Sequence, residues 1–230
     1  MLERGTVKEL IDQSLSKGIF GEGFEFRAGQ REVIEAICNH YIEDPQGTII
    51  LDAPTGSGKS LIAMWSAHIL KELGKRGYLV TSDLMLQDQY EEDFKRLKLN
   101  WPSIRGVDNY TCSVNDLPFS LADCKMKGIG YEAAEKLKCW GTCGYLQGRR
   151  RAKELPVALF NYSYYLIQRN YVEDKMQEQD REIPFPIRDF VFFDEAHKVD
   201  SIVQSHFSPR IDMGTPKLFK EVNKFIQKHG

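Results

Sequence analysis

Three observations predict an α/β fold built on a parallel sheet. Apolar runs at 48–51 and 190–193 are followed by turn-forming or polar residues, as expected of strands covered on both faces. A segment with helical periodicity separates the first run from another apolar run at 78–81. This strand–helix–strand order requires a crossover, and crossovers join parallel strands.

The remaining elements have local signals. A capping box at Thr6-Val7-Lys8-Glu9 begins a first amphipathic helix that Gly18 ends. A second helix follows Gly29, with Val33, Ile34, Ile37 and Tyr41 on one face. We further predict helices at 59–73 and 84–97, strands at 78–81, 157–160 and 190–193, a charged loop at 173–182 and a last helix beginning at Thr215-Pro216.

Composition and charge exclude several classes of protein. The 230 residues are 42% hydrophobic and 28% charged, which is a globular mixture and not that of a disordered or collagen-like chain. The net charge of −2 gives no sign of a nucleic-acid partner, although a local basic groove remains compatible with it. No apolar run reaches the roughly 20 residues of a membrane span, and residues 1–5 lack a signal-peptide core. We therefore expect an intracellular protein, cytoplasmic or nuclear, with no membrane partner.

The strongest motif is Ala53-Pro54-Thr55-Gly56-Ser57-Gly58-Lys59-Ser60, which lies between an apolar run and a helical segment. It matches the phosphate-binding pattern G-x-x-x-x-G-K-[ST] with alanine in place of the first glycine. Small residues let backbone N–H groups surround a phosphate at the N-terminus of the following helix. Lys59 would neutralise the β- and γ-phosphates of ATP, and the Ser60 hydroxyl would bind Mg²⁺. The alternative is a glycine-rich turn that binds nothing.

An acidic pair follows the last apolar run, in Asp194-Glu195-Ala196-His197. The carboxyl end of a buried parallel strand lies at the mouth of the sheet, beside the phosphate loop. Asp194 would hold Mg²⁺ through water, Glu195 would orient or activate the attacking water, and His197 would couple the nucleotide to neighbouring groups. The alternative is a helix N-cap with an acid in the first turn.

Four of the five cysteines lie in one stretch that has no clear periodicity. Cys112, Cys124, Cys139 and Cys143 are separated by 11, 14 and 3 residues. Structural zinc sites show two close pairs, whereas four irregularly spaced thiolates also suit a [4Fe–4S] cluster. The spacing leaves iron–sulfur, zinc and buried free thiols open. Cys38 stands alone on a helix, and we predict it to be a core residue.

Together these motifs resemble the iron–sulfur helicases of superfamily two, the XPD and DinG family. That family also carries four cysteines between motif Ia and the DEAH box. Further matching segments are Phe26-Arg27-Ala28-Gly29-Gln30 (the adenine-reading motif), Thr81-Ser82 with Leu86-Gln87 (motif Ia), 105–112, Cys143-Gly144-Tyr145 and Phe160-Asn161-Tyr162.

The resemblance implies a RecA-like P-loop NTPase domain interrupted by a cluster domain. Residues 1–104 and 149–200 would form the two parts of the first motor domain, and 105–148 the inserted iron–sulfur domain. Residues 201–230 would be either the start of an Arch-type insertion or a strand and helix that return to the motor domain. The implied activity is an ATP-dependent DNA helicase that moves 5′ to 3′ and uses ATP, Mg²⁺ and a [4Fe–4S] cluster held by the four cysteines.

The resemblance also implies roles for single residues. Lys59, Asp194, Glu195 and His197 would be catalytic. The nucleotide would be bound by Arg27, Gln30, Pro54, Thr55, Gly56, Ser57, Gly58, Lys59 and Ser60. Single-stranded or forked DNA would be bound by Thr81, Ser82, Tyr110, Arg149, Arg150 and Arg151. The alternatives are a solvated helix face for the arginine run and a core position for Tyr110.

The sequence departs from the family after residue 198, where nothing resembles motifs III to VI. We expect a fragment or split subunit that is weakly active without a second motor domain, because that domain supplies an arginine worth roughly 10³–10⁵ in rate in related phosphoryl transfer. The alternatives are a non-catalytic nucleotide- and nucleic-acid-binding module, a zinc-stabilised P-loop ATPase acting on protein or RNA, and a DEAH-type RNA helicase. No residue decides between DNA and RNA.

Overall fold

The computed structural model describes residues 5–126, 136–169 and 185–207, which surround a three-stranded parallel sheet. Strand β1 (Gly77–Thr81) is central and pairs with β2 (Val157–Asn161) on one side and β3 (Phe190–Phe193) on the other. The α/β class and the parallel strands predicted at 78–81, 157–160 and 190–193 are confirmed. The loop at 173–182 and the helix at Thr215-Pro216 lie outside the described residues.

The helices predicted for the first half of the chain, at 6–18, 30–41, 59–73 and 84–97, are also present. As a separate finding, none of the helices in the described ranges is long and apolar enough to cross a membrane. The helices are α1 (Gly5–Ser16), α2 (Gln30–Glu43), α3 (Lys59–Glu72), α4 (Leu84–Arg96), α5 (Asp123–Met126), α7 (Gly144–Glu154), α8 (Tyr162–Ile167) and α10 (Val199–Phe207), with 3₁₀ turns at Val107–Asn109, Phe119–Leu121 and Ala196–Lys198.

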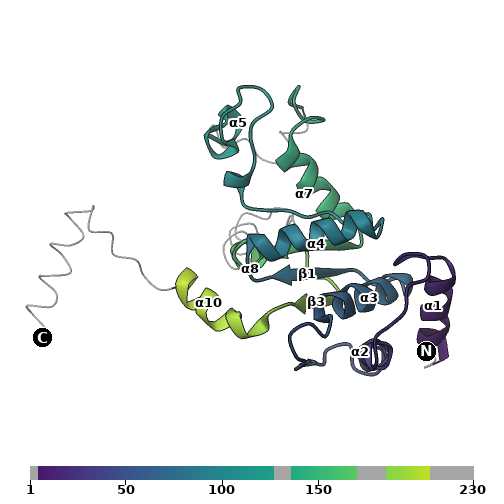
Figure 1. The fold of residues 1–230 in the computed structure, drawn as a ribbon. Helices are drawn as coiled ribbons and strands as arrows, with labels where there is room; N and C mark the ends of the chain where they lie inside the picture. Colours follow the sequence, from purple (N-terminus) through teal and green to yellow (C-terminus); the bar gives the residue numbers. More distant parts are fainter. Residues whose placement is uncertain (1–4, 127–135, 170–184, 208–230) are drawn as a thin grey trace, which may run out of the picture.

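The alternating strand residues divide the core into two clusters. Leu79 and Leu159 face a first cluster formed with α1, α2, α3 and α4, whereas Val80 and Phe160 face a second cluster formed with α7 and α8. Figure 1 shows α1, α2 and α3 gathered on one side of the sheet and α7 on the other. Strands β1 and β2 are therefore buried on both faces, which explains their continuous apolar runs, whereas the edge strand β3 is only partly buried.

The cysteine-containing stretch is packed onto the second face of this sheet. Cys112 and Cys143 are buried in the same cluster as Val80 and Phe160, and Cys124 packs against it. Cys38 lies instead in the first cluster, where burial raises the pKa of its thiol to about 12. The prediction of a core role for Cys38 is confirmed.

The strand predicted at 48–51 is wrong. These residues have no assigned secondary structure and are exposed, with 89% of Ile50 accessible to solvent. An apolar run becomes a strand only where a neighbour offers backbone hydrogen-bond partners. In the described part of the chain the sheet has only three strands, and none of them pairs with 48–51. The composition of a segment does not specify such a neighbour.

A buried arginine ties the amino-terminal end of the sheet to α7. The Arg188 guanidinium donates to the carbonyls of Gly77 and Pro156 at 3.0 and 3.1 Å, and also to those of Ala152 and Lys153 in the last turn of α7. It lies 4.4 Å from the centre of the Tyr78 ring. Burial lowers the pKa of Arg188 to about 10. One side chain thus joins β1, β2 and α7.

Candidate nucleotide-binding site

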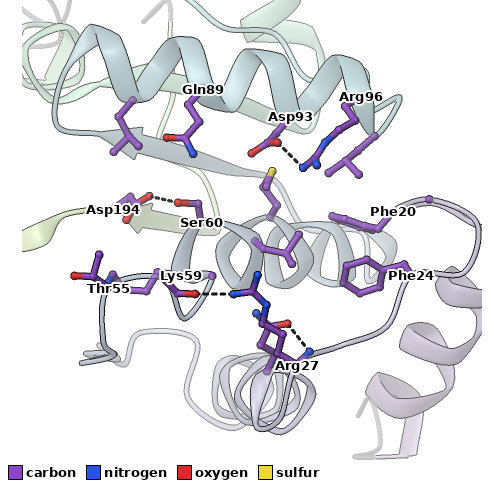
Figure 2. Close-up of a pocket in the computed structure, with 18 of the residues that line it drawn as sticks. Phe20, Phe24, Arg27, Thr55, Lys59, Ser60, Gln89, Asp93, Arg96 and Asp194 are labelled. Carbon is purple, nitrogen blue, oxygen red and sulfur yellow. Dashed lines mark hydrogen bonds and ion pairs between the residues drawn. The ribbon is translucent and has the colours of Figure 1, made fainter.

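A cavity of about 930 Å³ lies at the carboxyl end of the sheet. This volume is at the upper end of the range typical of small-molecule sites, roughly 300–1,000 Å³. Figure 2 shows Thr55, Lys59, Ser60 and Asp194 at one end and two phenylalanines at the other. The lining residues include Phe20, Phe24, Arg27, Gln30, Thr55, Gly56, Gly58, Lys59, Ser60, Gln89, Asp93, Arg96, Asp194 and Glu195.

The predicted phosphate loop at 53–60 forms the floor of this cavity and opens α3. Gly56 and Gly58 have left-handed backbones, with φ of 81° and 84°, a region that glycine enters without strain. The Lys59 ammonium lies across the loop and donates to the carbonyls of Ala53 and Pro54 at 3.0 and 3.3 Å. Within the described residues the buried Ser57 hydroxyl has no hydrogen-bond partner. The loop therefore places a cation and an unused polar group at the N-terminus of a helix, as an anion site requires.

Arg27, just before α2, and Gln30, its first residue, bind the backbone of this loop. Arg27 donates to the carbonyl of Gly56 at 2.7 Å, and the Gln30 amide donates to the carbonyl of Ser57 at 2.8 Å. The Gln30 amide oxygen accepts the backbone N–H of Arg27 at 3.0 Å. Both ends of the buried Gln30 amide are thus used within the protein. The structure places these predicted nucleotide-binding side chains against the loop, and their contact with a base stays a prediction.

The carboxylate of Asp194 stands directly above the loop, one residue beyond β3. Its Oδ2 atom accepts the Ser60 hydroxyl at 2.9 Å and the Tyr90 hydroxyl at 2.7 Å, and Oδ1 accepts the backbone N–H of Glu195 at 3.0 Å. The N–H of Asp194 donates to Val80, which continues the pairing of β3 with β1. A hydroxyl and a carboxylate from two elements are the hard oxygen ligands that Mg²⁺ prefers, so this pair fits that ion.

Glu195 lines the cavity, and His197 follows it two residues along the chain. Glu195 has a left-handed backbone, with φ of 57°, and its carboxylate lies 3.3 Å from His197 Nδ1. The His197 side chain is 70% exposed. Of these two predicted catalytic residues, Glu195 lines the cavity and His197 is turned to solvent beside it.

The predicted nucleic-acid contacts at the end of β1 are bonded to the start of α4. Thr81 is fully buried and its hydroxyl donates to the carbonyl of Asp83, while the Ser82 hydroxyl donates to the Asp83 carboxylate. Lys198 donates to both Ser82 and Asp83. The N–H of Leu86 and these donors lower the pKa of Asp83. Hence the α4 N-terminus is tied to the segment that follows Asp194.

The other predicted contacts, Tyr110 and the arginines of α7, lie on the second face of the sheet. The Tyr110 ring packs edge-on against Tyr145 at 5.3 Å, and its hydroxyl accepts the N–H of Arg105. The arginine run is engaged with its neighbours: Arg149 with the rings of Tyr145 and Phe185, Arg150 with Glu154, and Arg151 with Asn100.

Of the four predicted cluster ligands, Cys112, Cys124 and Cys143 lie on or against the second face of the sheet. All four are free thiols, and burial raises the pKa of Cys143, to which the nearby Cys139 and Cys124 add. In the described ranges, however, no three His, Cys, Asp or Glu side chains lie close enough together to hold a metal ion. Binding of an iron–sulfur cluster by the four cysteines therefore stays a prediction.

Sequence reasoning missed the partners that α4 supplies. Tyr90 bonds the Asp194 carboxylate, and burial together with that carboxylate raises the pKa of Tyr90 well above its ordinary value. Gln87 joins the Asn161 amide to Ser103 and to the carbonyl of Ile104. The available signal was spacing, since Gln87, Tyr90 and Phe94 are the buried residues of α4 and share one face.

Two comparisons bear on this site. Comparison with curated proteins gives no match. The model of the family described as "Type III restriction enzyme, res subunit" (ResIII) matches residues 23–226, a range that contains the phosphate loop, Asp194 and the whole described sheet. The chain therefore belongs to the ResIII family, whose domain is the N-terminal motor of superfamily-two helicases.

Proposed function

We propose that this chain is the ATP-binding motor lobe of a nucleic-acid helicase. The observation that carries the proposal is the 2.9 Å bond between Ser60 on α3 and Asp194 after β3, directly above a glycine-rich loop with a lysine. Family membership implies ATPase and helicase-type activity. The geometry supplies an anion site and two oxygen ligands within one cavity.

In this proposal each group has a separate task. The loop amides and the α3 N-terminus bind the phosphates, and Lys59 moves from the loop carbonyls onto them. Mg²⁺, when bound, neutralises charge on the β- and γ-phosphates. Ser60 and Asp194 would hold the metal, Glu195 would orient the attacking water, and His197 would keep Glu195 in place through their 3.3 Å contact.

The finer parts of the proposal come from the resemblance to the XPD and DinG helicases. We propose DNA as the substrate, 5′ to 3′ movement, and the division into 1–104, 105–148, 149–200 and 201–230. A second motor domain in cis or in trans would complete the site with an arginine. In support of this, both arginines that line the described cavity are already bonded within the lobe, Arg27 to Gly56 and Arg96 to Asp93. Among the proposed DNA contacts, Arg150 and Arg151 are exposed, whereas Thr81 and Ser82 are buried. Tyr110 and Arg149 are the remaining proposed contacts.

Lys59→Ala tests the proposed nucleotide site. A charge-assisted hydrogen bond is worth about 1.5–3 kcal/mol, so we expect ATP affinity in Mg²⁺ to fall about tenfold to hundredfold. The measurement is titration calorimetry with the non-hydrolysed analogue AMP-PNP. Lys138→Ala, an exposed lysine on the cysteine-containing stretch, is the control and should bind like the wild type. Equal affinities for all three proteins would overturn the proposal.

We also propose that Cys112, Cys124, Cys139 and Cys143 bind a [4Fe–4S] cluster. The support is that all four thiols are free and that two are buried on one face of the sheet. Protein purified without oxygen should contain about four irons and four acid-labile sulfides per chain, as a Cys₄-held cluster requires. Each Cys→Ser variant should lose them, and Cys38→Ser should keep them. One zinc and no iron would show a structural zinc site instead.

A further inference from the structure

One oxygen of Asp194 receives two hydroxyl groups from two different helices. Ser60, on α3, reaches Oδ2 at 2.9 Å, and Tyr90, on α4, reaches it at 2.7 Å. The other carboxylate oxygen is occupied by the Glu195 N–H. The carboxylate is therefore held on both sides, and the rotation about its Cβ–Cγ bond is restricted.

The Tyr90 hydroxyl bonds the Asp194 carboxylate and also interacts with the Ser60 hydroxyl that bonds the same oxygen. The residue is 1% exposed, and its ring belongs to the first core cluster, where it meets Phe94 edge-on with ring centres 6.0 Å apart. Phenylalanine would make the same ring contacts. A buried hydroxyl needs a hydrogen-bond partner, and here the shortest contact is with the carboxylate that also bonds Ser60 at the end of the phosphate loop.

Helix α4 holds Tyr90 in a fixed place relative to the strand ends. Its N-cap, Asp83, is bonded to Lys198, four residues beyond Asp194. One turn further along, Gln87 is fully buried and accepts the Asn161 amide at the end of β2. Tyr90 lies three residues after Gln87 on the same face, so the helix cannot turn without breaking buried hydrogen bonds.

We propose that Tyr90 is a positioning residue for the magnesium site, keeping Asp194 Oδ2 beside the Ser60 hydroxyl so that the two metal ligands are assembled before the nucleotide arrives. The inference rests on the proposed function, since it assigns a role within the same site. Tyr90 itself touches neither metal nor nucleotide in this role. It acts through Asp194, and its effect should appear only in the part of nucleotide binding that depends on magnesium.

Tyr90→Phe separates this role from packing. The ring is kept, and Asp194 Oδ2 retains Ser60, so no buried acceptor loses its last donor. We measure AMP-PNP affinity by calorimetry in Mg²⁺ and in EDTA, and take the ratio of the two dissociation constants. Because a hydrogen bond to a charged group is lost, we expect the ratio of the dissociation constant in EDTA to that in Mg²⁺ to fall about tenfold. The affinity in EDTA should be unchanged.

Tyr78→Phe is the matched control. Tyr78 is equally buried and donates its hydroxyl to the carbonyl of Pro186 at 2.8 Å, away from the cavity. The ratio of the AMP-PNP dissociation constants in EDTA and in Mg²⁺ should be the same for this variant as for the wild type. This should hold even if thermal unfolding shows that Tyr78→Phe loses as much stability as Tyr90→Phe. A wild-type ratio in Tyr90→Phe, an equal loss in Mg²⁺ and in EDTA, or loss of the fold would each overturn the proposal, because each makes the hydroxyl dispensable or only structural.

A double-mutant cycle with Asp194→Asn tests whether Tyr90 acts through the Asp194 carboxylate. If Tyr90 acts through the Asp194 carboxylate, Tyr90→Phe should change the ratio little once Asp194 is replaced. Failure of the proposed function has a different signature, because wild type and Lys59→Ala would then bind AMP-PNP equally. Failure of the inference alone leaves the Lys59 effect intact.

Discussion

Replacing Gly58 with alanine is expected to weaken AMP-PNP binding about a hundredfold. Gly58 has φ of 84°, and a Cβ there would lie 2.5 Å from Gln30 Nε2. Left-handed backbone costs a side-chain-bearing residue about 1–2 kcal/mol, and displacing Gln30 removes its bond to Ser57, worth about 1–3 kcal/mol when the partner stays buried. About 1% of the molecules would then have the loop in the binding-competent form. The apparent affinity would fall to about one hundredth of the wild-type value.

Gly74→Ala is the matched control for this prediction. Gly74 has nearly the same backbone, with φ of 78°, but a Cβ there meets no atom within 4 Å. It lies in the turn after α3, outside the cavity. We expect a loss of about 1 kcal/mol in the free energy of unfolding and wild-type AMP-PNP affinity. If both variants bound equally well, the Gln30 support of the loop would be unimportant for binding.

Arg188→Met is expected to lower the free energy of unfolding by about 4 kcal/mol. Four backbone carbonyls accept from this guanidinium, and each buried acceptor left unpaired costs about 1–3 kcal/mol. Buried side-chain ion pairs can often be replaced by apolar residues, because both partners are removed together. Here the acceptors belong to the backbone and remain. The measurement is urea unfolding followed by circular dichroism on the whole chain.

Arg150→Met removes the same charge from the solvent side of α7. Arg150 is half-exposed and pairs with Glu154 one turn along the helix. Such pairs contribute about 0.3–0.5 kcal/mol, so this variant should unfold close to the wild type. Similar losses in the two variants would show that net charge, and not the four carbonyl bonds, explains the effect of Arg188.

Local pattern was sufficient for most of the fold. Helices α1 to α4 were predictable because the signals for a helix, its caps and its apolar periodicity, lie within the helical segment itself. β1, β2 and β3 were predictable because each contains an unbroken apolar run. The run at 48–51 has the same composition yet forms no strand, because pairing depends on a neighbour elsewhere in the chain. Composition describes the segment alone.

The part of the site that lies within a single sequence motif could be predicted. The contacts that form between helices distant in the sequence could not. The loop at 53–60 and Asp194 were found because their spacing is local and their chemistry specific. The bonds of Tyr90 to Asp194 and of Lys198 to Asp83 join residues about 100 positions apart, and neither residue type indicates such a role. The direction of the four cysteine side chains is likewise a property of packing, so spacing left iron, zinc and free thiols open.

The shared core of the second face links the chemistry of the cysteines to the integrity of the whole sheet. Cys112 and Cys143 are buried together with Val80 and Phe160, which belong to the strands that carry the nucleotide cavity. The described cysteine-bearing residues therefore share a core with these strands, and removing them would expose part of one face of the sheet to water. Any ligand that binds these thiols only in the folded state must, by mass action, stabilise the strands as well. Conversely, alkylating the buried thiols is expected to destabilise the sheet, since an added group would overpack this core.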